Sequence, residues 1–319
     1  MGKITKIWLI TAAALVLGGC LIMGGTMTVL KWDFSKLSTV KYEENTTEIS
    51  DAFSKISMET DTADITLALS EDGKCKVVCY EDSAANHSVS VEDDALTVKL
   101  GKKAWYKYIG INFATPKVTV YLPQAEYTSL VIKNDTGDIT LPKEFSFGSA
   151  DLALSTGNVS LSAAVSGQVS IRTSTGDIQI AETAVGGLDL EVDTGKVTLN
   201  DVVCQGDFRL TVSTGKAFMT NMQCKNFTTT GDTGKVTMTN VIASEKFSIE
   251  RSTGDVTFDG CDAAEILVET STGDVTGNLL TEKVFITNTS TGKVQVPESV
   301  TGGKCKITTS TGDIKITIG

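Results

Sequence analysis

Ten Thr-Gly dipeptides recur along this chain at intervals of 19 or 20 residues. Their glycines are Gly137, Gly157, Gly176, Gly195, Gly215, Gly234, Gly254, Gly273, Gly292 and Gly312. A fixed period of this size indicates one structural unit that is copied and stacked. Because glycine takes positive φ at little steric cost, each dipeptide marks an equivalent tight turn.

Apolar residues stand at fixed distances from each repeat glycine. The residue seven positions before the glycine is always apolar, from Leu130 through Phe208 to Cys305, and so is the residue two positions after it, from Ile139 to Ile314. The positions between them are mostly polar, so each side of the turn alternates with period two. This pattern is typical of half-buried strands, and it predicts two strands joined at a corner in every unit.

One such unit cannot fold alone, because its few inward side chains cannot offset the entropy of ordering 19 or 20 residues. Stacking supplies the missing burial, so we predict an all-β fold, a parallel β-solenoid of about ten rungs. The alternative is a meander of antiparallel hairpins. It would place the often polar residue three positions before the glycine, such as Asn134 or Arg251, on the same face as an apolar one, which favours the solenoid.

The chain divides into four predicted regions, which are 1–32, 33–50, 51–128 and 129–319. The first is a membrane segment, the second a short polar spacer, the third an irregular β cap and the fourth the regular solenoid. Within the cap, residues 56–67 reproduce the repeat pattern with Ala63 in place of glycine, which predicts a degenerate rung. Residues 89–100 predict a hairpin, and residues 118–122 predict a further strand.

The N-terminus predicts attachment to a membrane. Lys3 and Lys6 precede an uncharged stretch of 24 residues from Ile7 to Leu30, which is long enough to span a bilayer as a helix. The lysines favour a cytoplasmic N-terminus and an extracytoplasmic remainder. Within the same stretch, residues 17–20 have the form of a lipobox, so the alternative is a lipoprotein anchored at Cys20. A buried soluble helix is the third interpretation, and we favour the uncleaved anchor.

Charge and motifs limit the function classes. The net charge of −11 leaves −14 on residues 33–319 once Lys3, Lys6 and Lys31 are set aside. The predicted rod is therefore acidic, and it is not expected to bind nucleic acid. No motif for a catalytic nucleophile, a nucleotide or a cofactor occurs, and the single histidine, His87, is interpreted as a solvated loop residue. We therefore expect no catalytic residues and no cofactor, and a protein that is not an enzyme.

Aspartates follow several repeat glycines, as they do in calcium-binding β-rolls. Four rungs carry lysine at that position, namely Lys196, Lys216, Lys235 and Lys293. Because lysine repels calcium, a continuous calcium ladder is excluded, and an isolated site around Asp255 and Asp274 is a minor alternative. No metal site is predicted.

Cys204 and Cys224 each lie nine residues after a repeat glycine, so they should stack on adjacent rungs. A disulfide between them is within reach, although buried thiols are favoured, as they are for Cys261 and Cys305. Cys75 and Cys79 should face the same way along one strand, about 13 Å apart, which is too far for a disulfide.

Two surfaces are candidates for binding, although the sequence defines no ligand-binding residues. An aromatic cluster at Trp105, Tyr106, Tyr108 and Phe113 would either plug the first rung or bind a ligand such as a glycan. The last rung reaches Ile318 and leaves no sequence for a cap, so its sheet edge is predicted to be open. We expect this edge to self-associate or to dock a partner.

The repeated Thr-Gly-Asp/Lys-Ile/Val units, the degenerate rung and the Asp33–Thr39 stretch after the membrane segment resemble a bacterial β-strand-repeat family of unknown function labelled "putative adhesin". The resemblance covers most of residues 33–319. It implies a β-solenoid ectodomain and a role at the cell envelope of the Gram-positive type, and it implies no catalytic residues. The chain lacks an LPxTG sorting signal, so attachment to the wall by sortase is not expected.

Two functions follow from these observations. The first is a membrane-anchored, extracytoplasmic binding or adhesion module with a protein or glycan partner. The second is a structural or sensory scaffold in envelope stress signalling, which would act through its membrane helix. A hydrolase in a solenoid groove is disfavoured because no acidic pair recurs at groove positions.

Overall fold

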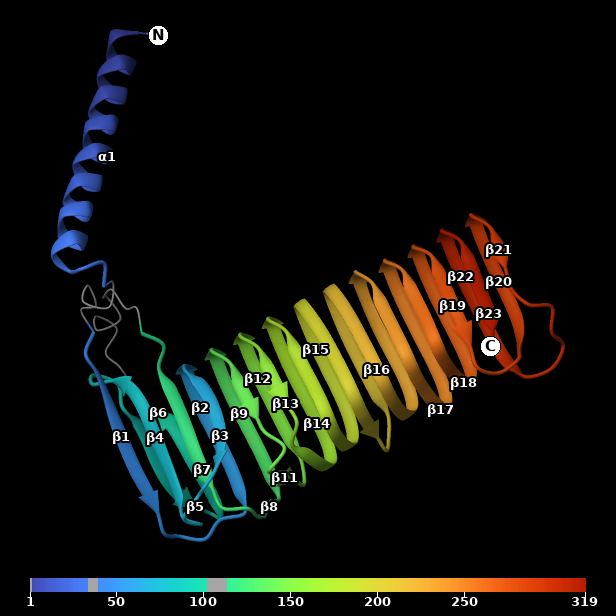
Figure 1. Cartoon of the computed structure of the whole chain (residues 1–319), viewed down its shortest axis with the longest axis horizontal. Coiled ribbons are helices and arrows are strands. Elements are labelled where there is room, and N and C mark those ends of the chain that lie inside the picture. Colours follow the sequence, from blue (N-terminus) through green and yellow to red (C-terminus); the bar gives the residue numbers. More distant parts are fainter. Residues whose placement is uncertain (1, 34–39, 102–113) are drawn as a thin grey trace.

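The computed structural model describes residues 2–33, 40–101 and 114–319. An N-terminal helix, α1 (Lys3–Val29), precedes one long stack of β-strands (Figure 1). The mean hydropathy of an 18-residue window in α1 is 2.2, and none of that window is buried. The helix is therefore long and apolar enough to cross a membrane, as an anchor or as a signal sequence.

The regular part of the stack is a parallel β-solenoid, as predicted. Neighbouring rungs pair in parallel, and each repeat threonine lies beside the next, as in Thr136, Thr156, Thr175 and Thr194. The meander of hairpins is thereby excluded. The strands of the first two rungs are β9 (Ser129–Thr136), β10 (Ile139–Leu141), β11 (Ser146–Phe147), β12 (Ala150–Thr156), β13 (Val159–Leu161) and β14 (Ala164–Thr175). The strands of the following rungs run through the corners and are β15 (Ile178–Cys204), β16 (Phe208–Thr233), β17 (Val236–Thr253) and β18 (Val256–Thr272).

Each rung has more corners than the single one predicted. The first rung already contains three strand segments, β9, β10 and β11. A second corner lies six residues after the repeat glycine and has φ between 52° and 63° at Glu182, Asp201, Asn221, Asn240 and Gly260. Asn and Asp tolerate this left-handed conformation, and the Asn221 amide donates to Asp201 at 2.8 Å. Because the residue type varies from rung to rung, this corner has no fixed signature in the sequence.

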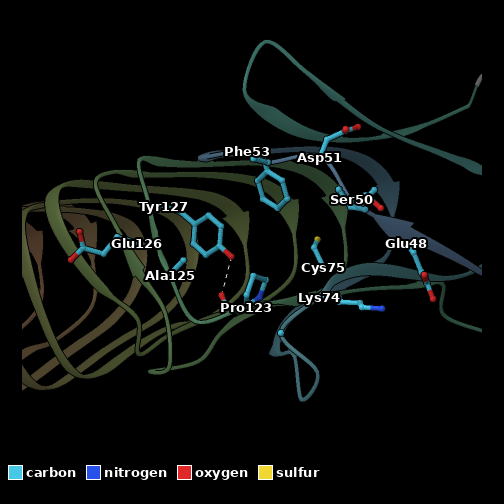
Figure 2. Close-up of a pocket in the computed structure, with 13 residues that line it drawn as sticks. Glu48, Ser50, Asp51, Phe53, Lys74, Cys75, Pro123, Ala125, Glu126 and Tyr127 are labelled. Carbon is cyan, nitrogen blue, oxygen red and sulfur yellow. Dashed lines mark hydrogen bonds between the residues drawn. The ribbon is translucent and has the colours of Figure 1, made fainter.

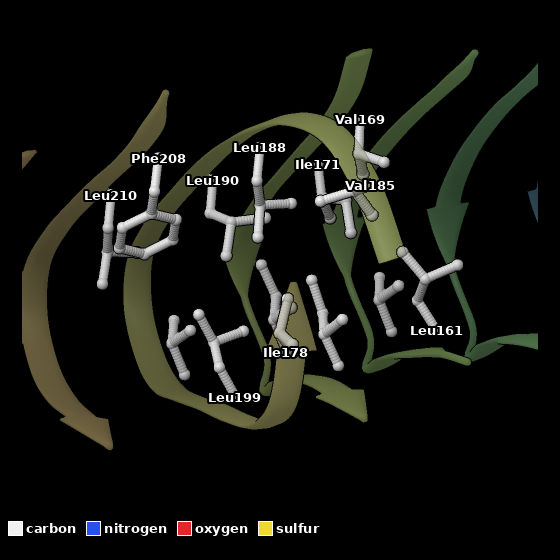
Figure 3. Packing of buried hydrophobic residues seen from close by; sticks show 14 of the residues in the cluster. Leu161, Val169, Ile171, Ile178, Val185, Leu188, Leu190, Leu199, Phe208 and Leu210 are labelled. Carbon is white, nitrogen blue, oxygen red and sulfur yellow. The ribbon is translucent and has the colours of Figure 1, made fainter. Parts of the chain in front are cut away.

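The core is a set of apolar columns that run along the stack (Figure 3). Leu188, Leu190 and Leu199 are fully buried, as are their counterparts in the next rung, Phe208, Leu210 and Met219. The rings of Phe208 and Phe227 pack tilted at a centroid distance of 4.8 Å, and those of Phe227 and Phe247 pack edge to face at 5.1 Å. Each ring pair contributes about 0.5–1.5 kcal/mol beyond its burial. The core therefore extends through the stack as a continuous column in which every rung depends on its neighbours.

The repeat glycines are required by close approach as well as by turn conformation. Gly215 has φ 155°, and a Cβ there would overlap the carbonyl oxygen of Gly195 in the rung before it. The same clash recurs along the column, with Gly312 against Gly273 and Gly292 against Gly312. The column of repeat glycines therefore has no room for a side chain. The order of the glycines along the column shows which rungs are neighbours.

The N-terminal cap closes the stack with out-of-order and antiparallel strands. The predicted degenerate rung consists of β2 (Lys55–Thr62) and β3 (Asp64–Leu69), which pair in parallel with β9 and β10. A further rung, β6 (Ala95–Leu100) and β7 (Lys117–Leu122), lies outside it. The remaining cap strands are β1 (Tyr42–Ile49), β4 (Cys75–Asp82), β5 (His87–Glu92) and β8 (Glu126–Tyr127).

Two cap predictions can be compared directly with these strands. The hairpin over residues 89–100 is present as the antiparallel pair β5–β6. The spacer over 33–50 is wrong in its second half, because Tyr42–Ile49 forms β1 and pairs antiparallel with β4, which in turn pairs with β7. The sequence of β1 is polar because it is an edge strand with little buried surface, and such a polar stretch has the same composition as a linker.

The distal end does not follow chain order. After β19 (Val275–Leu279), the strands β20 (Lys283–Thr291) and β21 (Val294–Gln295) skip one rung position, and β22 (Gly303–Thr311) and β23 (Ile314–Ile318) fill it. β22 pairs with β18 on one side and with β20 on the other. The prediction that the last rung in the sequence forms the open edge is therefore wrong. The end of the solenoid is β20–β21 (Figure 1).

Candidate functional site

The outermost strand at the distal end, β20, is an edge without charged protection. Among the described residues it has one ladder partner, β22. Residues 284–291 contain no charged side chain, and Ile286 is 50% exposed on the outward face. Soluble proteins usually protect an edge strand with charge, proline or a bulge, because its free N–H and C=O groups can pair with another chain. β20 is therefore a ready surface for strand addition.

The one charge in β20 is turned inward. Lys283 is buried, and its Nζ lies 2.6 Å from Asp262 Oδ1 and 2.6 Å from Thr281 Oγ1. This ion pair ties the beginning of β20 to the second corner of the β18 rung. The lysine therefore fixes the position of the strand and leaves its outer edge neutral.

A loop partly covers the core at the distal end. Residues 296–302 follow β21, and Val296 packs against the core while Val300 is 92% exposed. Thr301 Oγ1 donates to Glu282 Oε2 at 2.6 Å, and Ser299 Oγ donates to the same oxygen at 3.3 Å. The loop is thus pinned at its base. It shields the apolar core and leaves the hydrogen-bonding edge of β20 exposed.

The opposite end of the stack carries an edge of different character. β1 pairs with β4 and presents Glu43, Glu44 and Glu48. A second chain that paired with this strand would bring its own backbone and side chains against three carboxylates. Strand addition is therefore disfavoured at the β1 edge of the N-terminal cap.

A cavity of about 450 Å³ opens at the N-terminal end of the core (Figure 2). Phe53 and Tyr127 stack in its wall with ring centroids 5.9 Å apart, and the Tyr127 hydroxyl donates to the Pro123 carbonyl at 2.9 Å. Burial raises the pKa of Tyr127 to about 12 and that of Cys75 to about 11. A protonated thiol is a weak nucleophile, so Cys75 does not offer this cavity an activated nucleophile.

His87 lies elsewhere than the sequence predicted. It is the first residue of β5, and its side chain is only 2% exposed, so the solvated-loop interpretation is wrong. Its Nδ1 lies 2.5 Å from Glu81 Oε2, which also accepts the His87 backbone N–H at 2.6 Å. The buried carboxylate explains the inward position. Sequence reasoning missed it because a glutamate on the inward face of a strand reads as an outward residue.

Cys79 joins this pair. Sγ of Cys79, a carboxylate oxygen of Glu81 and a ring nitrogen of His87 all lie within 4.8 Å of one another. Burial, and secondarily the charge of Glu81, raises the pKa of the Cys79 thiol to about 12. The available signal was the spacing of Cys79 and Glu81, which face the same way two residues apart in one strand.

The aspartates that follow the repeat glycines serve the backbone. Asp255 Oδ1 accepts the Asp274 backbone N–H at 3.1 Å, and Asp274 Oδ1 accepts that of Asp313 at 2.7 Å. Each carboxylate thus caps the turn of the neighbouring rung, and Asp313 Oδ1 accepts the Lys293 backbone N–H of the outermost rung at 2.7 Å. Among the described residues, Asp255 and Asp274 do not form a three-ligand group, unlike Cys79, Glu81 and His87.

The remaining candidates from the sequence are the cysteines of the repeats and the aromatic cluster. Cys204 and Cys224 are buried free thiols on adjacent rungs. Cys261 and Cys305, further along the stack, are also buried free thiols. Burial raises the pKa of Cys224 to about 12, which makes it unreactive near neutral pH. The aromatic cluster from Trp105 to Phe113 lies outside the described residues, so its role stays a prediction.

The family model described as Toastrack DUF4097 matches residues 53–215 and 205–319. A solved structure of a "putative adhesin" from Parabacteroides distasonis is 13% identical, with TM-score 0.45, and the alignment covers 85% of this chain and 98% of that one. A "putative lipid binding protein" from the same organism is 12% identical, with TM-score 0.44 and coverage of 86% and 97%. A "putative adhesin" from Bacteroides fragilis is 17% identical, with TM-score 0.37 and coverage of 86% and 97%. No curated protein matches the chain.

Proposed function

Since the chain belongs to the Toastrack DUF4097 family, we propose that it is a membrane-anchored binding module that presents the distal end of its solenoid on the extracytoplasmic side. In this proposal α1 stays in the membrane as an uncleaved anchor. Lys3 and Lys6 lie before the apolar stretch and favour a cytoplasmic N-terminus. The β-solenoid is then exported.

The observation that carries the proposal is the neutral, single-sided edge of β20. Its backbone can add a strand from a partner, and main-chain hydrogen bonds would give the affinity. Ile286 and Val294 are 50% and 43% exposed beside this edge and would contact alternate side chains of the partner. The partner is therefore an extended protein segment.

The shape of the molecule supports this role. α1 and β20 lie at opposite ends of the chain's long axis (Figure 1). Ten repeat rungs spaced by about 4.8 Å make a rod roughly 45–50 Å long. The solenoid thus acts as a rigid spacer that holds β20 away from the anchored end.

The proposal assigns no catalysis to the chain. The thiols of Cys75, Cys79, Cys224 and Cys305 are buried, and burial raises their pKa values to between about 11 and about 12. A thiol in that state is not an activated nucleophile. Binding through a sheet edge needs no such group.

The test uses a photo-cross-linking amino acid in the full chain, produced in intact cells. It is placed at position 286, and a matched control carries it at position 267, which occupies the same outward column two rungs further in. We expect a discrete protein adduct from position 286 that is absent from position 267. No adduct at 286, or equal adducts from both positions, would contradict the proposal.

The location is tested separately by adding protease to the same intact cells. We expect the solenoid to be cleaved or released from the outside and α1 to be retained. Protection of the solenoid until the membrane is permeabilised would place it in the cytoplasm. An intact mass that begins at a lipidated Cys20 would replace the helical anchor with the lipoprotein alternative.

A further inference from the structure

Three different metal-binding groups meet inside the N-terminal cap. Cys79 and Glu81 extend inward from β4, and His87 begins β5 after the short turn that follows. Their donor atoms lie within 4.8 Å of one another, and the side chains of Glu81 and His87 are each only 2% exposed. A thiol, a carboxylate and an imidazole are thus held together in a nearly dry environment.

The hydrogen bonds of the cluster are incomplete. Glu81 Oε1 accepts from Asn45 Nδ2 at 2.8 Å, and Glu81 Oε2 faces His87 Nδ1 and the His87 backbone N–H. Among the residues that the structure describes, none is a hydrogen-bond partner of the other ring nitrogen, the buried His87 Nε2. Leaving a buried polar atom without a partner destabilises the fold. Proteins normally satisfy a buried charged or polar group by pairing it or by coordinating a metal.

We propose that Cys79, Glu81 and His87 form a binding site for a divalent transition metal ion, with Zn²⁺ as the preferred ion. Zinc binds Cys sulfur, His nitrogen and carboxylate oxygen at about 2.0–2.3 Å, so its ligands lie about 3.3–3.8 Å apart. The donor atoms lie within 4.8 Å of one another, and His87 Nδ1 and Glu81 Oε2, which are 2.5 Å apart, would separate to admit the ion. A fourth ligand, such as a water molecule, would complete the tetrahedral coordination.

Asn45 supports this assignment from outside the donor set. It comes from β1, and its amide donates to one Glu81 oxygen, which fixes the carboxylate in the cluster. Partners of this kind orient metal ligands in known sites. A bound ion would connect β4 and β5 directly, and Asn45 would link them to β1. These are the three antiparallel strands that close the stack, so the site would fasten the cap.

The test is a Co²⁺ titration of the reduced, chelator-treated full chain in detergent micelles. We expect one equivalent of Co²⁺ to bind with a thiolate-to-cobalt charge-transfer band in the near ultraviolet and intense visible bands of a four-coordinate ion. Zn²⁺ should displace the cobalt and remove these bands. Absence of the charge-transfer band at saturating Co²⁺ would overturn the proposal without any variant.

Variants then locate the site. Cys79→Ser should abolish the charge-transfer band, and Glu81→Gln and His87→Asn should each weaken Co²⁺ binding by at least about 10-fold. Cys75→Ser is the matched control, because Cys75 is a buried thiol on the same face of β4, outside the cluster. Loss of the band in Cys75→Ser, or its retention in Cys79→Ser, would overturn the assignment. Circular dichroism of each variant confirms that its β-structure is intact.

Discussion

The two ends of the solenoid differ in the strands that form the edge of the sheet. At the N-terminal end, the parallel stack passes into the antiparallel strands β1, β4 and β5, and the outermost strand β1 carries three glutamates. At the distal end, the stack stays parallel to its last rung, and residues 284–291 of the outermost strand are uncharged. One edge is protected against further pairing and the other is open to it.

This difference separates closing the core from closing the sheet. The distal loop covers the apolar core through Val296, and β22 inserts between β18 and β20. The stability of the last rung is thus provided from within the stack. The outward edge of β20 has no ladder partner among the described residues, and the proposed function assigns this edge to a partner.

The largest expected effect comes from the inserted rung, in which glycine is packed between two others. Gly312→Ala should destabilise the distal end by about 3–5 kcal/mol, because its Cβ would overlap the Gly273 carbonyl oxygen in a strained conformation. The matched control is Gly73→Ala near the N-terminal end, where φ is 72° and no atom lies within 4 Å of the added Cβ. That variant should cost only about 1–2 kcal/mol. Denaturant unfolding measures the loss of stability in both variants. Equal losses would contradict the prediction that close packing makes Gly312 the more sensitive position.

A core truncation should distinguish the inserted strand from the edge strands. Ile307→Ala in β22 removes a fully buried side chain and should cost about 2–5 kcal/mol. Ile286→Ala in the exposed β20 edge should change stability by less than about 0.5 kcal/mol. Hydrogen exchange should show the first loss mainly in β18, β20 and β22. If Ile286→Ala were as costly as Ile307→Ala, β20 would be an interior strand.

The arrangement of the rungs shows what the sequence could and could not predict. The Thr-Gly period predicted the parallel stack and, through Ala63, the degenerate rung, because one inward pattern recurs at a fixed spacing. It could not predict the order at the distal end, since the rungs of Gly292 and Gly312 have the same pattern and either fits beside Gly273. The inward position of His87 depends on its contact with Glu81; alternation within β4 places Glu81 on the inward face but does not show which residue of β5 it meets.

Removing charge from the N-terminal edge tests whether its carboxylates prevent strand pairing there. Glu44→Val with Glu48→Val removes exposed carboxylates from β1 and should produce concentration-dependent self-association in sedimentation experiments. The stability of the folded chain should change by less than about 1 kcal/mol, since these side chains are exposed. If the variant stays monomeric at high concentration, the carboxylates are not what protects the N-terminal edge.

The smallest expected effect is a pH dependence at the N-terminal cavity. The pKa of Tyr127 is raised from 10 to about 12 by burial, so the folded state holds this proton more tightly than the unfolded chain does. The resulting stability is fully present below pH 10 and is lost as the pH rises towards 12. Tyr127→Phe should cost about 1 kcal/mol near neutral pH through the lost hydrogen bond.

The free energy of unfolding of the wild type and of Tyr127→Phe is then measured in the same buffers between pH 8.5 and 12. This range covers about two pH units around the pKa of tyrosine in the unfolded chain. The advantage of the wild type should shrink across this range and disappear at its upper end. An advantage that stays constant with pH would mean that Tyr127 titrates normally and is not buried as described.

The order of the distal rungs is the central claim, and engineered disulfides test it directly. In the structure Lys306 lies between Leu267 and Ile286 in one outward column. Adjacent strands are about 4.8 Å apart, within the span of a disulfide, whereas positions two rungs apart are too distant. We predict that oxidation links Leu267→Cys with Lys306→Cys, and Ile286→Cys with Lys306→Cys, but leaves Leu267→Cys with Ile286→Cys unlinked. Rapid linkage of the Leu267–Ile286 pair would mean that the rungs stack in chain order, and it would move the open edge to the C-terminal strand.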